Sequence, residues 1–76
     1  MNPTLIGRTD QDRYREIGRG LRSVREDLGL NMGQLSEVLQ CTIGHVSDRE
    51  LGRVAWSPEM LREHLAALVL LATRVR

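Results

Sequence analysis

The 76-residue chain has no lysine and no phenylalanine, and Tyr14 and Trp56 are its only Tyr or Trp residues. With so few large rings, the core must be built from aliphatic side chains, and Trp56 is expected to plug a loop. All 11 basic residues are arginine. A GC-rich coding sequence would explain the use of arginine in place of lysine. A functional explanation is that guanidinium groups bind phosphate and guanine in a bidentate way. The net charge of +1 excludes a strong overall field toward nucleic acid.

Cysteine and long apolar runs are also scarce. Cys41 is the single cysteine, so no internal disulfide can form, which fits a reducing cytosol. The longest apolar run, LAALVLLA at 65–72, is much shorter than the roughly 20 residues that a bilayer requires. Residues 1–13 show no signal-peptide pattern. We expect one soluble, cytoplasmic domain without a membrane partner.

The sequence offers no constellation for catalysis or metal binding. Cys41 and His45 are four residues apart, but a metal needs three or four ligands, and only the remote His64 or Asp48 could add one. No Ser-His-Asp spacing and no phosphate-binding loop is present. We therefore expect no enzyme activity, no cofactor, no metal and no small-molecule substrate.

Helical periodicity dominates the chain after a flexible arm at 1–8. Thr9 or Asp10 can cap a helix that Gly29 ends in a left-handed conformation. Asn31 can cap a second helix, and Thr42 a third that ends at Gly52. The apolar positions of the first helix, at steps of three and four, are Tyr14, Ile17, Leu21, Val24 and Leu28.

A long last helix completes this pattern. Ser57-Pro58-Glu59 is a strong start signal, and nothing breaks the helix before Arg74. Its expected inward residues are Met60, Leu61, Leu65, Leu68 and Val69. The sequence thus predicts an all-α fold of four, or at most five, helices, with residues 9–76 forming one domain.

The segment LRSVREDLGLNMGQLSEVL…VSDRELG resembles the phage repressor and Cro type of helix-turn-helix domain, a xenobiotic response element-like family. The resemblance covers about residues 17–68. It implies a lambda-repressor-like bundle in which the second and third helices form the helix-turn-helix. The matching positions are Leu21, Arg25, Gly29, Leu30, Leu35, Leu39, Val46, Glu50 and Gly52.

The resemblance also implies functional residues. In the family a basic residue at Arg25 bonds the acid matching Glu50; two unrelated solvated charges are the alternative. Family phosphate contacts fall on Asn31 and Thr42, whereas Met32 departs from a frequent Gln and Gln40 from a customary Gly. The base-contacting positions correspond to Ile43, Gly44, His45, Ser47 and Asp48.

That base-contacting set is weak for hydrogen bonding, and arginines partly compensate. Ile43 can touch only a thymine methyl, and Asp48 can accept from cytosine but repels phosphate. Arg49 occupies a usually buried aliphatic position and could extend its head to a phosphate. Arg8 in the arm could enter the minor groove. The other predicted phosphate ligands are Arg15, Arg19, Arg22 and Arg53, for which an ordinary solvated face is the alternative.

The last helix is apolar on nearly every side, which a small monomer would not need. We expect a symmetric homodimer through it, formed by Leu68, Leu70, Leu71, Ala72 and Val75; burial within one chain is the alternative. The combined prediction is a sequence-specific DNA-binding transcriptional regulator, a dimeric repressor on an inverted repeat in double-stranded DNA at the nucleoid. The alternative function is a protein-interaction module, an anti-repressor or adaptor, on the same fold.

Overall fold

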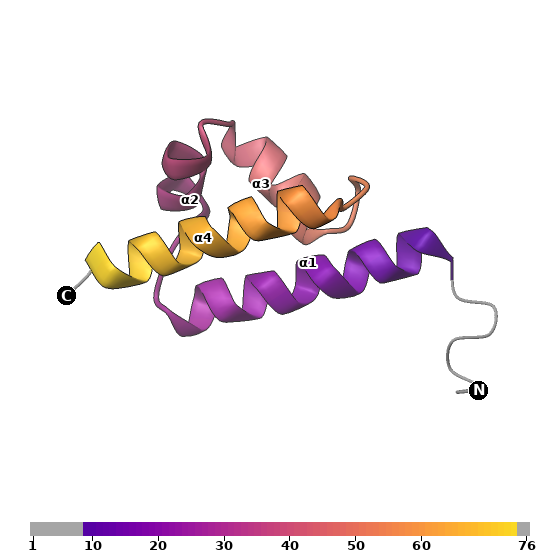
Figure 1. Cartoon of the computed structure of the whole chain (residues 1–76), viewed down its shortest axis with the longest axis horizontal. Coiled ribbons are helices and arrows are strands. Elements are labelled where there is room, and N and C mark those ends of the chain that lie inside the picture. The colour runs from indigo at the N-terminus through magenta and orange to yellow at the C-terminus, as the bar shows by residue number, and fades with distance from the viewer. Residues whose placement is uncertain (1–8, 75–76) are drawn as a thin grey trace.

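The computed structural model describes residues 9–74, which form four helices and no strand. These are α1 (Asp10–Asp27), α2 (Met32–Leu39), α3 (Ile43–Glu50) and α4 (Pro58–Arg74). The two long helices, α1 and α4, run in the same direction, and the short α2 and α3 are seen above α4 in Figure 1. In space, α3 packs against both α1 and α2, and α2 packs against α4. An all-α fold is confirmed. A fifth helix is absent from the described range, and the predicted arm at 1–8 lies outside it.

Each helix begins at the predicted cap. The Thr9 hydroxyl accepts from the Asp12 amide at 3.1 Å, and the Asn31 side chain accepts from the Gln34 amide at 2.8 Å. In both cases the side chain at the third helical position bonds back to the cap amide. Thr42 caps α3, and the Ser57 hydroxyl accepts from the amide of Met60 in α4 at 3.1 Å. These bonds satisfy amides that a helix start leaves without partners.

A residue with a left-handed backbone conformation follows each of the first three helices. Gly29 has φ +71° and Gly52 has φ +73°, as the sequence predicts for residues that follow a helix. Gln40, between α2 and α3, has φ 55° and ψ 47° although it carries a side chain. The turn therefore keeps the geometry that a glycine would favour, and Gln40 bears the steric cost.

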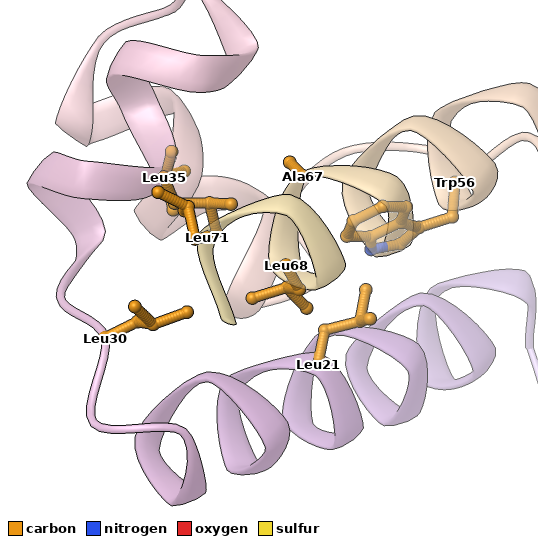
Figure 2. Packing of buried hydrophobic residues seen from close by; sticks show 8 residues of the cluster. Leu21, Leu30, Leu35, Trp56, Ala67, Leu68 and Leu71 are labelled. Atoms are coloured by element: carbon orange, nitrogen blue, oxygen red, sulfur yellow. The ribbon is translucent and has the colours of Figure 1, made fainter. Parts of the chain in front are cut away.

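The core joins all four helices through aliphatic side chains (Figure 2). Leu35 of α2 and Val46 of α3 are completely buried, and Leu21 of α1 lies below Leu68 of α4. Trp56 is buried in the loop before α4, as predicted. The complete buried set is Leu21, Leu30, Leu35, Val46, Trp56, Ala67, Leu68 and Leu71.

Two predicted inward stripes are partly wrong. On α4, Leu65 and Val69 are 43% and 63% exposed, because the buried face follows His64, Leu68 and Leu71 instead. Near the end of α1, Val24 and the C-cap residue Leu28 are also exposed. The chain thus leaves apolar side chains on its surface.

The end of α3 lies directly against α1. A Cβ added at Gly18 would collide with the backbone carbonyl oxygens of Arg49 and Glu50, and one added at Gly52 would collide with the backbone of Arg15. Only glycine allows this approach at both places. The contact fixes the position of α3 relative to α1.

Candidate nucleic-acid interface

The first turn of α3 presents its outer side to solvent. Ile43 is 53% exposed, and Gly44 and His45 are exposed as well. Val46 points inward and is fully buried, which anchors the helix. Ser47 and Asp48 are half-buried. The structure thus brings the five predicted base-contacting residues onto one short helix, with the first three the most accessible.

The starts of α2 and α3 expose the predicted phosphate-binding caps. Asn31 and Thr42 are both exposed, and their side-chain oxygens accept from the amides of Gln34 and His45. The capping bond uses Oδ1 of Asn31, so its amide NH₂ group is a donor outside the cap. Both caps sit at the positive end of a helix, where an anion is favoured.

Three of the arginines of α1 share a surface with the end of α3. Arg15, Arg19 and Arg22 are exposed and stand at steps of four and three along the helix. They border a hollow of about 210 Å³ that also reaches Leu51. A neighbouring hollow of about 250 Å³ joins Arg22 to Ser47. The arginine stripe therefore adjoins the half-buried edge of α3.

Most of these arginines make weak, exposed ion pairs. Arg15 lies 3.4 Å from Asp12, and Arg22 lies 3.4 Å from Glu26. Arg53 lies 3.5 Å from the Asp48 carboxylate, with both side chains largely accessible. Exposed pairs of this kind contribute about 0–1 kcal/mol, so their arginines can exchange a carboxylate for a phosphate at little cost.

A buried ion pair holds α3 to α1. Nε and Nη2 of Arg25 donate to the two carboxylate oxygens of Glu50 at 2.7 and 3.1 Å, and Nη1 donates to the Leu30 carbonyl at 2.9 Å. The hydrogen bond to Glu50 raises the pKa of Arg25 above its usual value. The pair that the family resemblance implies is therefore present, with both side chains buried, and the alternative of two solvated charges is wrong.

Arg49 does not extend to the surface, and its predicted phosphate contact is wrong. The residue is only 8% exposed. Its guanidinium carbon lies 5.9 Å from the centre of the Trp56 ring, and Nη1 lies 3.5 Å from Nδ1 of His64. Trp56 also donates from Nε1 to the Arg49 carbonyl at 3.1 Å. Arg49 thus fills the usual aliphatic position by packing its head between α3 and α4.

His64 is a core residue that the sequence did not reveal. It is fully buried on α4, with its ring centre 5.1 Å from that of Trp56 in an edge-on arrangement. Burial, together with the charges of Arg49 and Arg25, lowers the pKa of His64 to about 4. The neutral ring can accept from Arg49 through Nδ1, which places the proton on Nε2. Within residues 9–74, neither this Nε2 nor Nε of Arg49 has a hydrogen-bond partner.

The predicted dimer residues divide between core and surface. Leu68 and Leu71 are 2% and 7% exposed because they pack inside their own chain, so they cannot form a dimer interface in this fold. Leu70 is 41% exposed and Ala72 is half-buried. Val75 lies outside the described residues, as does Arg8 of the arm.

Two negative findings apply to residues 9–74. They contain no group of three or more His, Cys, Asp or Glu side chains placed to hold a metal ion. None of their helices is both long and apolar enough for a membrane span.

Comparisons with known proteins found no matching family model, no matching curated protein and no matching solved structure.

Proposed function

We propose that this chain is a sequence-specific DNA-binding transcriptional regulator of the lambda-repressor-like helix-turn-helix type, which lays α3 along the major groove of double-stranded DNA. The observation that carries the proposal is the accessible outer side of α3. Ile43, Gly44 and His45 are exposed at the start of a helix whose Val46 is fully buried. A helix anchored on one side and open on the other can enter a groove about 12 Å wide.

The connection between α2 and α3 supports this assignment. Only the residues from Gln40 to Thr42 separate the two helices, which suits the steep crossing of a helix-turn-helix pair. Ser36, a small residue, is buried and donates to the Gly33 carbonyl at 2.8 Å. In such pairs the second helix contacts base edges while the first crosses the backbone.

The side chains of α3 offer modest base contacts. His45 and Ser47 can donate hydrogen bonds, and Ile43 can touch a thymine methyl group. A Cβ added at Gly44 would meet only the Thr42 hydroxyl at 3.9 Å, so the helix backbone can approach the groove floor there. Because α3 offers few base-contacting side chains, part of the DNA sequence specificity in this proposal comes from the shape and deformability of the DNA.

Phosphate contacts supply most of the affinity in this proposal. Arg15, Arg19 and Arg22 flank α3 on one side, and Arg53 follows it. The exposed ion pairs of Arg15, Arg22 and Arg53 are easily exchanged. The pairing of Asp48 with Arg53 also offsets the repulsion between its carboxylate and the DNA.

The regulator is proposed to act as a homodimeric repressor on an inverted repeat at the nucleoid. A symmetric dimer would place two copies of α3 about 34 Å apart, one turn of DNA. The exposed Leu70 supports an apolar contact between copies. Bound in this way, the dimer would occlude a promoter.

Selection of bound duplexes from a random pool tests the proposal. The wild type should enrich a palindromic consensus, and the double variant Ser47→Ala/Asp48→Ala should lose or alter it. Arg62→Ala, an exposed change on α4, is the matched control and should leave the consensus unchanged. If the wild type enriches no duplex, the DNA-binding proposal fails.

The second candidate function is a protein-interaction module, such as an anti-repressor or adaptor. The exposed Leu65, Val69 and Leu70 on α4 favour it, as does the small hydrogen-bonding set on α3. Ionic strength separates the two functions, because an apolar protein interface responds weakly to salt whereas phosphate contacts respond steeply.

A further inference from the structure

A groove runs along the surface between α2 and α4. Two open hollows of about 560 and 350 Å³ lie on either side of Leu70. Apolar side chains from both helices line it, among them Val38 and Ala66, and Leu70 is shared by the two hollows. Glu63 lines the hollow at one end of the groove, whereas Arg74 lines the other hollow together with Glu37 of α2. The groove therefore has an apolar middle, an acidic side chain at one end and a basic side chain beside an acidic one at the other, and on α4 itself the two charges are opposite.

The α4 side of this groove is a single helical stripe. Glu63, Ala66, Leu70 and Arg74 follow at steps of three, four and four, which places them on one face. Leu70 protrudes from this face at 41% exposed, whereas Ala66 is small and exposed. The stripe thus carries both a projection and a recess.

We propose that a second copy of this chain docks on the groove, with the two α4 helices antiparallel and related by a twofold axis. Residues 63 and 74 are equally distant in sequence from the midpoint between 68 and 69. An antiparallel pairing about that midpoint sets Glu63 of each copy opposite Arg74 of the other. It also sets Leu70 opposite Ala67, which is buried but lines one of the hollows, so that each leucine enters the hollow of the opposite copy.

Self-complementarity identifies the occupant as a second copy. In a twofold contact the same patch appears on both sides, so a patch that fits itself must contain both members of each complementary pair. The α4 stripe meets this condition for charge, with Glu63 and Arg74, and for shape, with Leu70 and the hollow beside Ala67. The other exposed apolar residues of α4, Leu65 and Val69, lie on a different side of the helix and line neither hollow.

This inference deepens the proposed function, on which it rests for the biological role of the dimer. It assigns the surface that would join two copies of the regulator. Of the dimer residues expected from the sequence it keeps Leu70, leaves out Leu68 and Leu71, which are buried in their own chain, and adds Glu63 and Arg74.

Sedimentation equilibrium without DNA tests the charge pairing. The wild type should be a dimer at micromolar concentration. Glu63→Arg and Arg74→Glu each place like charges together twice in the dimer, so each should weaken it by roughly tenfold. The double variant Glu63→Arg/Arg74→Glu restores opposite charges and should return to the wild-type dissociation constant. A monomeric wild type, or a double variant no tighter than the single ones, would overturn the proposal.

A second pair of variants locates the apolar contact. Leu70→Glu should yield monomers, and Val69→Glu, one residue earlier and about 100° around α4, should remain dimeric. Both positions are exposed, so circular dichroism should show unchanged helix content. The reverse pattern would overturn the assigned surface. A dimer with this behaviour that enriches no duplex would contradict the DNA-binding function alone, and a monomer that enriches one would contradict the interface alone.

Discussion

Arg25 and Glu50 meet in a two-pronged buried ion pair that ties the middle of α1 to the end of α3. Removing Glu50 would leave the Arg25 guanidinium buried with only the Leu30 carbonyl as acceptor. Glu50→Ala should therefore lower the free energy of unfolding by about 3–5 kcal/mol. Urea denaturation measures this loss. Glu26→Ala, which breaks the exposed pair with Arg22, is the control and should cost less than about 1 kcal/mol; equal losses would show that the buried pair has no special role.

Replacing glycine by alanine should have opposite effects on stability at two positions of α1. Gly18→Ala would push a methyl group into the carbonyls of Arg49 and Glu50 and should destabilise the protein by about 1–3 kcal/mol. Gly20→Ala meets nothing within 4 Å and should stabilise it by about 0.4–1 kcal/mol, since alanine favours the helix. Thermal unfolding of both variants checks the signs. A stabilised Gly18→Ala would contradict the close packing of α1 on α3.

The turn between α2 and α3 offers a similar test. Gln40 is left-handed, so Gln40→Gly should relieve its steric cost and raise the free energy of unfolding by up to about 1 kcal/mol. Gly29→Ala is the counterpart, because Gly29 shares the left-handed conformation with open space around it, and should lower stability by a similar amount. Chemical denaturation of the two variants should give changes of opposite sign; a destabilised Gln40→Gly would be inconsistent with the turn described.

His64 makes stability depend on pH. Its pKa is about 4 in the folded protein and about 6.5 when unfolded, so the unfolded chain binds more protons between these values. The contribution of neutral His64 is complete above about pH 6.5 and is lost as pH falls toward 4, by about 3 kcal/mol in total. Unfolding followed by fluorescence of Trp56, the single tryptophan, measures it. His64→Gln should show a shallower decline over this range, and parallel curves for the two proteins would refute the assignment.

Local signals in the sequence predicted the helices well, because caps and left-handed residues act within a few positions. Thr9, Asn31, Thr42 and Ser57 all begin helices where the sequence predicts, and Gly29 and Gly52 follow helix ends. The ion pair expected from the family resemblance is also present. The caps and the left-handed glycines depend on residues a few positions apart, and the ion pair depends on aligning the sequence with the family.

Local signals could not predict which side of α4 is buried or that the Arg49 side chain points inward. When apolar residues occur on every side of a helix, their spacing does not show which side is buried. On α4 the buried side includes the polar residue His64. For that reason Leu65 and Val69 were expected inside, and Leu68 and Leu71 at a dimer interface. Arg49 turns inward because Trp56 and His64, from later in the chain, form a pocket for its guanidinium. Such a pocket exists only after the helices have packed.

The proposal that α3 and the arginines of α1 grip DNA is tested most directly by the salt dependence of binding to an enriched duplex. The logarithm of the association constant should fall steeply with the logarithm of salt concentration, by about 0.9 per phosphate contact. Arg19→Gln, which removes one exposed guanidinium, should make the slope shallower by about that amount. A binding constant that barely changes with salt, with or without Arg19, would contradict the account.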